Sequence, residues 1–280
     1  MYRPISNTNR PITTNQQEFL EENPGVKLLH QLYDIPRWNL DDDHPKGVAI
    51  ILDIEGSLNN IRELAFVGVS YSKRDGKLYE LLFEFNDVHK MPDYMVEAIV
   101  DCGDILISHN AAFDRPIFDS RFPFFQNKPW ACSLKDINWK QYGFRHESLG
   151  HLLERFGWHF KEHTAMGDAK ALTQLLAEQF YNRFVMDKLL ENARELKVRV
   201  HAPYAPRIAN KEFKKKGYDF NEDYILSSRK KGTWYFDTSP EKAIQESVWL
   251  KDKWNVESII TELTPQINYT PEIIYGISTL

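Results

Sequence analysis

From residue 47 onwards, three apolar segments follow one another with only short gaps between them. Residues 47–52 form a short apolar run that stops at an acidic residue, which is typical of a buried strand. Residues 61–71 and 77–85 have the pattern of two further strands, and the polar turn at 73–76 between them is a hairpin signal. Three consecutive strands joined by tight turns predict an antiparallel meander.

Helix and strand patterns alternate after this meander. They predict helices at 91–101, 110–120, 149–156 and 165–184, and strands at 104–108 and 130–134. A strand that is reached through a crossover helix lies parallel to its partner. The order β-β-β-α-β-α-β-α-α therefore predicts an α/β fold, in which helices flank a mixed five-stranded sheet. This order resembles that of the ribonuclease H-like fold.

Changes of pattern divide the chain into three parts. Residues 1–46 are polar and interrupted by proline, so we expect an irregular N-terminal extension. Residues 47–187 hold the alternating elements. The pattern then restarts and predicts a small α+β domain over 188–280, with strands at 198–201 and 232–238 and helices at 209–217 and 239–254. From about residue 262 onwards we expect an extended, loosely attached tail.

The composition indicates a cytoplasmic protein without a membrane partner. No apolar run is long enough to span a bilayer, and the first residues lack the apolar core of a signal peptide. Cys102 and Cys132 are far apart and form no metal-type pair, so we expect reduced thiols. The net charge is −5, but residues 186–235 hold twelve Lys or Arg against seven Asp or Glu.

Two acidic residues end the first predicted strand. Asp53 and Glu55 are two positions apart, so both side chains project from the same face of the sheet. Acids at this spacing are common where a strand enters solvent, so the pair alone indicates little.

Two further segments place acids at the start of helices. Asn110 is positioned to cap the helix predicted at 110–120, and Asp114 falls in its first turns. An Asp there also complements the helix dipole without any other role. His163 and Asp168 are separated by about 500° of helical turn, so they do not share a helical face. We therefore expect His163 on the loop before the next helix and Asp168 on the helix.

The four acids stand at element ends that can meet at one edge of the sheet. Adjacent carboxylates repel and raise one another's pKa values, so such a cluster persists only where cations neutralise it. Oxygen-only ligands select hard ions such as Mg²⁺ or Mn²⁺. Two such ions, about 3.5–4 Å apart, hold the attacking and leaving oxygens of a phosphodiester in line.

The three segments resemble the Exo I, II and III motifs of the DnaQ-like (DEDD) exonuclease superfamily. They read LDIEG at 52–56, SHNAAFD at 108–114 and HTAMGDAKALTQLL at 163–176. The resemblance covers about residues 47–185. The superfamily includes the proofreading epsilon subunit of bacterial DNA polymerase III and related stand-alone exonucleases. The spacing of His163 and Asp168 is that of the histidine subclass, DEDDh. The three motifs in this order are far more specific than any one of them.

The resemblance implies a role for each motif residue. Asp53, Glu55 and Asp168 would hold the metal that carries the nucleophilic water. Asp53 and Asp114 would hold a second metal at the leaving oxygen, so the expected cofactors are two Mg²⁺ or Mn²⁺ ions. His163 would take the proton from the attacking water, because histidine changes charge near neutral pH.

The sequence departs from the family pattern at two positions. The family usually has Thr directly after the first motif's Glu, where this chain has Gly56 and then Ser57, which puts substrate affinity in question. The acid often found before the last Asp is Gly167 here.

Five residues are candidates for contact with substrate, and three of them, His109, Asn110 and Phe113, also have a structural alternative. The five are Gly56, Ser57, His109, Asn110 and Phe113. For Asn110 helix capping is the favoured alternative, and for Phe113 it is packing in the core.

Basic and aromatic residues alternate in the C-terminal part, at 214–218 and 229–235. Such a mixture can follow a phosphate backbone and stack on bases, and a solvated helix face with a lysine-protected edge strand explains it equally well. The hypothesis is that this part guides a single strand to the cleft.

The sequence as a whole predicts an enzyme that acts on nucleic acid with a free 3′ end. The expected activity is 3′→5′ exonuclease action on mainly single-stranded DNA, which releases nucleoside 5′-monophosphates. A 3′→5′ exoribonuclease similar to oligoribonuclease or RNase T is the first alternative, because the choice of sugar depends on a few contacts. An inactive nucleic-acid-binding module is another, as is a subunit that assists a DNA polymerase or repair partner.

Overall fold

The computed structural model describes residues 30–31, 46–86, 92–227 and 230–270. The chain forms two compact units. The N-terminal unit holds Met1–Asn110 and Ala131–Asn192, and the C-terminal unit holds Ala111–Trp130 and Ala193–Leu280. The predicted boundary at 187 falls inside the helix α6 (Val185–Arg194), and the second segment of the N-terminal unit ends at Asn192. Most of the predicted extension 1–46 lies outside the described residues.

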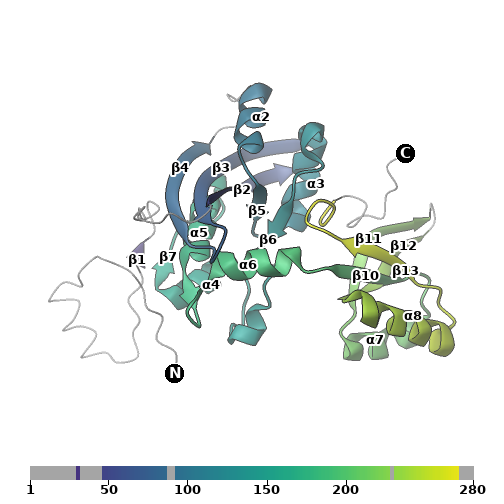
Figure 1. Ribbon diagram of the computed structural model, residues 1–280. Helices are drawn as coiled ribbons and strands as arrows, with labels where there is room; N and C mark the ends of the chain where they lie inside the picture. Colours follow the sequence, from purple (N-terminus) through teal and green to yellow (C-terminus); the bar gives the residue numbers. More distant parts are fainter. Residues whose placement is uncertain (1–29, 32–45, 87–91, 228–229, 271–280) are drawn as a thin grey trace. The chain divides into compact units, whose positions relative to one another are not determined.

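A mixed five-stranded sheet forms the framework of the N-terminal unit (Figure 1). Its strands are β2 (Lys46–Ser57), β3 (Asn60–Ser72), β4 (Leu78–Asn86), β5 (Ile105–Ser108) and β6 (Trp130–Cys132). Their order in the sheet is β4-β3-β2-β5-β6. The pairs β2–β3 and β3–β4 are antiparallel and β2–β5 is parallel, so the predicted meander, the crossover and the mixed sheet are confirmed.

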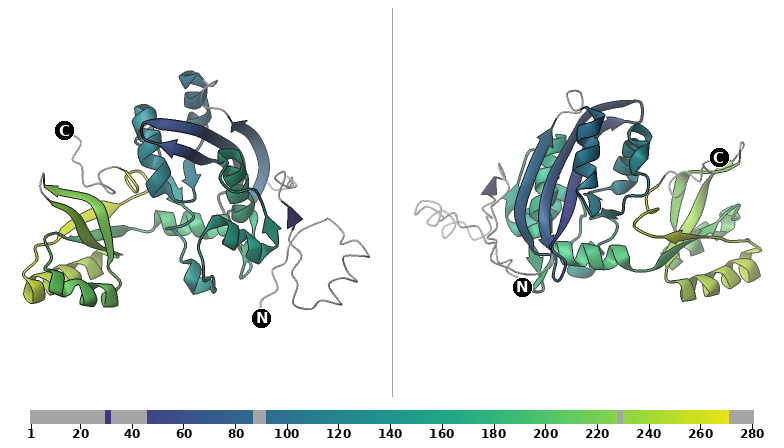
Figure 2. Two further views of the ribbon diagram at one scale, coloured as in Figure 1. Left: turned by 180° about the vertical axis from the view of Figure 1, so that it is seen from behind. Right: turned by 45° about the horizontal axis from the view of Figure 1, so that its top comes forward.

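The centre of this sheet is apolar on both faces. Ile50, Ile51 and Leu52 in β2 are fully buried, because helices and loops cover the sheet on either side. The helix α5 (Ala165–Ala177) packs against β2, β3 and β4. Figure 2 shows these long strands curling over α5, which brings the start of that helix to the end of β2 that carries the acids.

The helix predicted at 165–184 is shorter than expected. It ends at Ala177, and the next residues form a small hairpin of β8 (Gln179–Phe180) and β9 (Arg183–Phe184). The turn residues Tyr181 and Asn182 have φ of 51° and 60°, the left-handed conformation that a tight turn needs. The remaining elements of the unit are α2 (Asp93–Asp101), α4 (Leu149–Phe156), a 3₁₀ turn at Trp139–Tyr142, and β1 (His30–Gln31), which pairs with β7 (Trp158–His159).

The helix α3 (Ala111–Arg121) belongs to the C-terminal unit, and one buried arginine links it to other segments of that unit. Arg115 is fully buried and forms an ion pair with Asp119. Its guanidinium also donates to the backbone carbonyls of Gln126, Pro265, Gln266 and Asn268. The expectation of a loosely attached tail from residue 262 is therefore wrong as far as residue 268, since these carbonyls satisfy a buried cation.

The rest of the C-terminal unit is an antiparallel sheet with two helices on one face (Figure 1). Its strands are β10 (Lys197–Ala202), β11 (Asp219–Ser227), β12 (Lys230–Thr238) and β13 (Ile259–Leu263), in the order β11-β12-β10-β13. The helices are α7 (Asn210–Lys216) and α8 (Pro240–Trp254), and 3₁₀ turns lie at Pro123–Phe125 and Arg207–Ala209. Val200, Phe213 and Leu250 are fully buried between the two layers.

The predicted α+β arrangement of this part is thus found, but two of its four strands, β11 and β13, were not predicted. Within the described residues, no helix has the length and apolar character needed to cross a membrane.

Candidate metal centre

Three of the four predicted metal ligands meet in the N-terminal unit. Oxygen atoms of Asp53, Glu55 and Asp168 all lie within 4.8 Å of one another, and each residue is partly buried. Asp53 and Glu55 lie on β2, two positions apart, so they share one face of the sheet. Asp168 lies in the first turn of α5. The cluster therefore joins residues that are more than a hundred positions apart in the chain.

The start of α5 is built to hold Asp168 in place. Thr164 caps the helix, and its hydroxyl accepts the N–H of Gly167 at 3.3 Å. One carboxylate oxygen of Asp168, Oδ2, accepts the N–H groups of His163 and Thr164 at 2.9 and 3.2 Å. Among the described residues no donor contacts its other oxygen, Oδ1, which leaves that atom available to a cation.

The pKa of Asp168 is raised to about 6, mainly by burial and to a smaller extent by the negative charge of Glu55. The two N–H groups and His163 act in the opposite direction. A carboxyl group in this position resists ionisation, because burial and a neighbouring carboxylate both disfavour its charged form, and perturbed groups of this kind are concentrated at functional sites. Three carboxylates and no softer donor match the ligand preference of Mg²⁺ or Mn²⁺, so the residues present fit such an ion.

Replacing Asp168 with asparagine is expected to stabilise the metal-free protein at pH 8. The folded-state pKa lies above the unfolded value of 3.8, so the wild-type side chain loses stability as the pH rises from about 4 through about 6. Asparagine keeps the acceptor for both N–H groups and carries no charge. After discounting for solvent screening, we expect a gain of about 1 kcal/mol.

Urea unfolding in EDTA at pH 8 and near pH 4 measures this effect. The difference in the free energy of unfolding between Asp168→Asn and the wild type should be smaller at the lower pH, where the wild-type carboxyl is also neutral. Equal stability of the two proteins at pH 8 would contradict the effect of burial on this carboxyl. Adding Mn²⁺ should then reverse the order, because only the wild type gains a ligand-bound state.

Two residues of β3 support the cluster and were not found from the sequence. Glu63 lies opposite Glu55 in the sheet, and its carboxylate accepts the N–H of Ala165 at 3.0 Å, which ties the first turn of α5 to β3. Arg62 forms an ion pair with Glu55 at 3.2 Å, although its side chain is 67% exposed. Arg62 is the extra residue of a β-bulge, and bulges commonly redirect a side chain beside a functional site.

Backbone packing explains both departures from the family pattern. Gly56 has φ of 137°, and a Cβ there would lie 2.3 Å from the carbonyl oxygen of Asn60. A Cβ at Gly167 would lie 2.5 Å from the Thr164 hydroxyl and 2.7 Å from the carbonyl oxygen of Lys161. Each glycine therefore lets an acid-bearing element pack closely against its neighbour, and a larger side chain does not fit there unless the neighbouring atoms shift.

Introducing the family's threonine, as Gly56→Thr, is expected to destabilise the protein. The substitution forces a branched side chain into a left-handed backbone and against the turn between β2 and β3. We expect unfolding to cost about 2 kcal/mol less, which lowers the Tm by about 4–8 °C. Thermal unfolding followed by circular dichroism measures this, with Ser57→Thr at the exposed neighbouring position as the matched control. Similar Tm values for the two variants would contradict the clash.

His163 lies on the loop before α5, as predicted. It is exposed and has φ of 64°, and its backbone N–H, rather than its ring, contacts Asp168. The role of the ring as a base stays a prediction.

Asp114 and Phe113 lie in the first turn of α3, in the C-terminal unit. Asp114 is buried, and its role as the fourth metal ligand stays a prediction. Phe113 is 43% exposed, so the expectation of core packing is wrong and its ring remains available to a substrate. Asn110 is exposed with φ of 115°, whereas an N-cap residue is normally extended, so helix capping is not supported.

His109 has a structural role. Its Nε2–H donates to the carbonyl oxygen of Glu147 at 3.0 Å, and its Nδ1 accepts from the Ser133 hydroxyl at 2.7 Å. Burial lowers the pKa of the ring to about 4, so the ring is neutral at physiological pH, in agreement with these bonds. Because both ring nitrogens are engaged, we leave His109 out of the proposed substrate site.

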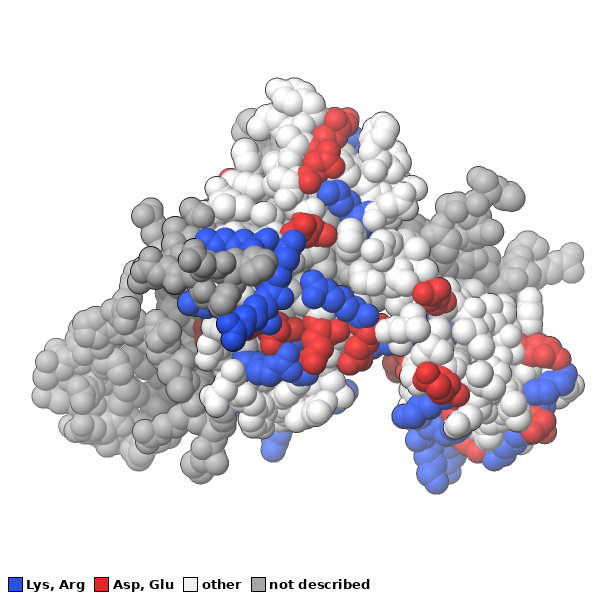
Figure 3. Space-filling view, in the orientation of Figure 1, with Lys and Arg blue, Asp and Glu red and all other residues white. Residues whose placement is uncertain are grey.

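Charged side chains of both signs interleave over α6 on the face seen in Figure 3. Arg183 pairs with Asp187 and Glu191, and Lys188 also pairs with Glu191. Acidic and basic side chains therefore balance in this helix, and the basic excess noted for residues 186–235 lies after its end.

The acidic trio is the chemistry-bearing cluster of the described residues. Among the described residues, one set of three or more His, Cys, Asp or Glu has its possible ligand atoms within 4.8 Å of one another. This set is Asp53, Glu55 and Asp168. No protein-family model matches the chain, and no curated protein matches it. The function is therefore inferred from the geometry of this cluster and from the motifs that supply it.

Proposed function

We propose that the chain is a metal-dependent 3′→5′ exonuclease of the DEDDh class. The observation that carries this proposal is the meeting of Asp53, Glu55 and Asp168 within 4.8 Å, since they come from the first and third motifs. A strand end and a helix start that are distant in sequence supply the three carboxylates together. A chance pair of surface acids would not require this arrangement.

The architecture supports the same class. Three antiparallel strands followed by parallel ones, in the order β4-β3-β2-β5-β6, are compatible with a ribonuclease H-like fold. In open α/β sheets, sites form where loops leave the ends of central strands. The acids stand at such a place, on the central strand β2 and at the start of α5.

Each residue has a proposed task. Asp53, Glu55 and Asp168 would hold one divalent cation, and the motif resemblance assigns Asp114 to a second one. When bound, the cations supply a nucleophile at neutral pH and neutralise the charge on the phosphodiester. His163 would accept the proton of the attacking water, and its exposed position on the loop leaves it open to solvent and substrate. Glu63 and Thr164 position the start of α5 through hydrogen bonds.

Digestion of 5′-labelled single-stranded DNA and RNA tests the proposal. With Mg²⁺ or Mn²⁺ we expect a ladder of products shortened from the 3′ end, and with EDTA no product. Cleavage of RNA without cleavage of DNA would select the exoribonuclease alternative. The absence of cleavage of either substrate with both metals would contradict the proposal and favour a binding module.

A further inference from the structure

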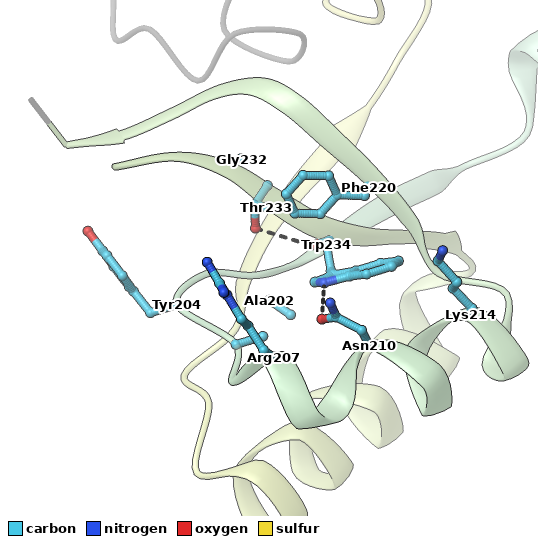
Figure 4. A pocket seen from close by; sticks show the side chains of 10 residues that line it. Ala202, Tyr204, Arg207, Asn210, Lys214, Phe220, Gly232, Thr233 and Trp234 are labelled. Atoms are coloured by element: carbon cyan, nitrogen blue, oxygen red, sulfur yellow. Dashed lines mark hydrogen bonds between the residues drawn. The ribbon is translucent and has the colours of Figure 1, made fainter. Parts of the chain in front are cut away.

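A cavity of about 480 Å³ opens in the C-terminal unit between α7 and the strands β11 and β12 (Figure 4). Its lining combines three aromatic side chains, two cations and no acid. The lining residues are Ala202, Tyr204, Ala205, Arg207, Asn210, Lys214, Phe220, Gly232, Thr233 and Trp234. The volume is in the range of small-molecule and nucleotide sites.

Two of the aromatic rings are held in fixed positions. Trp234 is only 7% exposed, and its indole N–H donates to the side-chain oxygen of Asn210 at 3.1 Å. Phe220 is 53% exposed and packs edge to face against Trp234, with ring centroids 5.2 Å apart. The ring of Phe220 also lies over Gly232, where a Cβ would be 2.5 Å away. A flat apolar ring is therefore presented to solvent on a rigid support.

The third aromatic residue, Tyr204, has φ of 57° and is half-exposed. A bulky residue in the left-handed conformation is strained, and such strain is concentrated at functional sites. Its side chain lies beyond that of Arg207, on the side away from Trp234 (Figure 4).

The lining contains two cations, Arg207 and Lys214. Among the described residues, no acidic side chain pairs with Arg207 or Lys214, whereas Lys216 pairs with Glu246 and Lys253 with Glu212. Figure 4 shows Arg207 and Lys214 on opposite sides of Trp234. The cavity thus has positive charge at two separate points and aromatic surface between them.

A second cavity, of about 340 Å³, adjoins the first. It shares Lys214, Phe220 and Trp234 with the first cavity and is otherwise lined by Gly217, Tyr218 and Asp219. The Phe220–Trp234 pair therefore stands between two neighbouring hollows, with Lys214 at the border of both.

We propose that these two cavities bind consecutive nucleotides of a single-stranded nucleic acid. Aromatic faces stack on any base, and unpaired cations beside them bind the phosphates that link the bases. Two hollows that share an aromatic pair fit a strand better than they fit one free nucleotide. The inference goes beyond the proposed nuclease activity and does not depend on the metal centre.

Fluorescence anisotropy of a 5′-fluorescein-labelled oligothymidylate of about 12 nucleotides tests the proposal with the full-length chain. EDTA is present throughout, so that binding is measured without metal-dependent cleavage. Phe220→Ala is expected to weaken binding about tenfold, and Arg207→Glu by at least as much. Phe124→Ala, at a phenylalanine that is 83% exposed, and Lys242→Glu on α8 lie outside the cavities and should bind as the wild type does.

The salt dependence provides a readout that a purely structural role would not change. Arg207→Ala should reduce the slope of log K against log salt by about 0.7, the contribution of one phosphate contact in a single strand. Unchanged affinity of Phe220→Ala, or equal weakening by the control variants, would overturn the proposal. Competition by thymidine monophosphate as strong as by unlabelled oligothymidylate would overturn it in favour of a mononucleotide site.

The two proposals can fail separately. Binding in EDTA without cleavage on addition of metal would leave the strand site standing and remove the nuclease. If Phe220→Ala gives the same cleavage products as the wild type and binds the oligonucleotide with unchanged affinity, the nuclease stands and the strand site is removed.

Discussion

Replacing Asp53 with asparagine is expected to lower the rate of 3′-end cleavage by about a thousandfold or more. In the proposed centre Asp53 would be a ligand of the divalent cations, so the substitution would remove one of the negative charges that hold them. Metal ions stabilise charge on reacting phosphoryl oxygens by several kcal/mol, and about 4 kcal/mol corresponds to a thousandfold in rate. Asparagine has the same shape as aspartate, so the sheet around it should be preserved.

Single-turnover digestion of a 5′-labelled oligonucleotide measures the rate, and thermal unfolding with and without Mn²⁺ measures metal binding. The wild-type Tm should rise with Mn²⁺, and the Tm of Asp53→Asn should not. Glu97→Gln, which removes an exposed acid of α2, is the matched control and should retain both activity and the Mn²⁺ response. Cleavage by Asp53→Asn within tenfold of the wild type would exclude the proposed metal centre.

The sequence predicts those elements well in which the local pattern of apolar residues already shows which side chains are buried. The run that contains Ile50, Ile51 and Leu52 is buried on both faces and cannot be mistaken for a surface segment. Helix α4 has a clear apolar stripe and a terminal glycine, Gly157, with φ of 92°. For both elements pattern and environment agree, so the predictions hold.

Other elements depend on contacts that no local pattern records. The end of α5 was missed because its turn uses Tyr181 and Asn182 in left-handed conformations, without the glycine or proline that usually signals a turn. Strand β13 was missed because Ile259 and Ile260 are nearly half-exposed and follow no alternation. Its position is set by pairing with β10, which only the folded sheet defines.

The residues of the site likewise fall into those that the sequence indicates and those that it does not. The motifs indicate Asp53, Glu55 and Asp168 through residue type and spacing, and the structure brings these three together. Arg62 and Glu63 escape such reasoning because their roles depend on the register of β2 against β3 and on a bulge. A strand carries no signal for register until its partner is known.

The stability of the centre and its chemistry oppose each other at Asp168. Burial raises the pKa of this carboxyl to about 6, so its ionised form is unfavourable until a cation is bound. A buried carboxylate cluster favours metal binding, but it lowers the stability of the metal-free protein. This explains why Asp168→Asn is expected to stabilise the protein and at the same time to remove its metal response.

Replacing His163 with asparagine is expected to slow cleavage by about a hundredfold to ten-thousandfold, the usual contribution of a general base. His163 has φ of 64°, and asparagine is among the residues that best tolerate this backbone conformation. The substitution therefore keeps the backbone N–H that contacts Asp168 and removes only the imidazole. The metal ligands are untouched, so the rise in Tm with Mn²⁺ should equal that of the wild type.

This combination separates a base from a positioning residue. If His163 acts as the base, His163→Asn loses kcat while KM and the Mn²⁺ response stay near their wild-type values. If it only positions Asp168 through the loop, the Mn²⁺ response falls together with the activity. His159→Asn, at an exposed histidine of β7, is the matched control and should cleave at the wild-type rate. Activity of His163→Asn within threefold of the wild type would remove the imidazole from the reaction, and the proton of the attacking water would then need another acceptor.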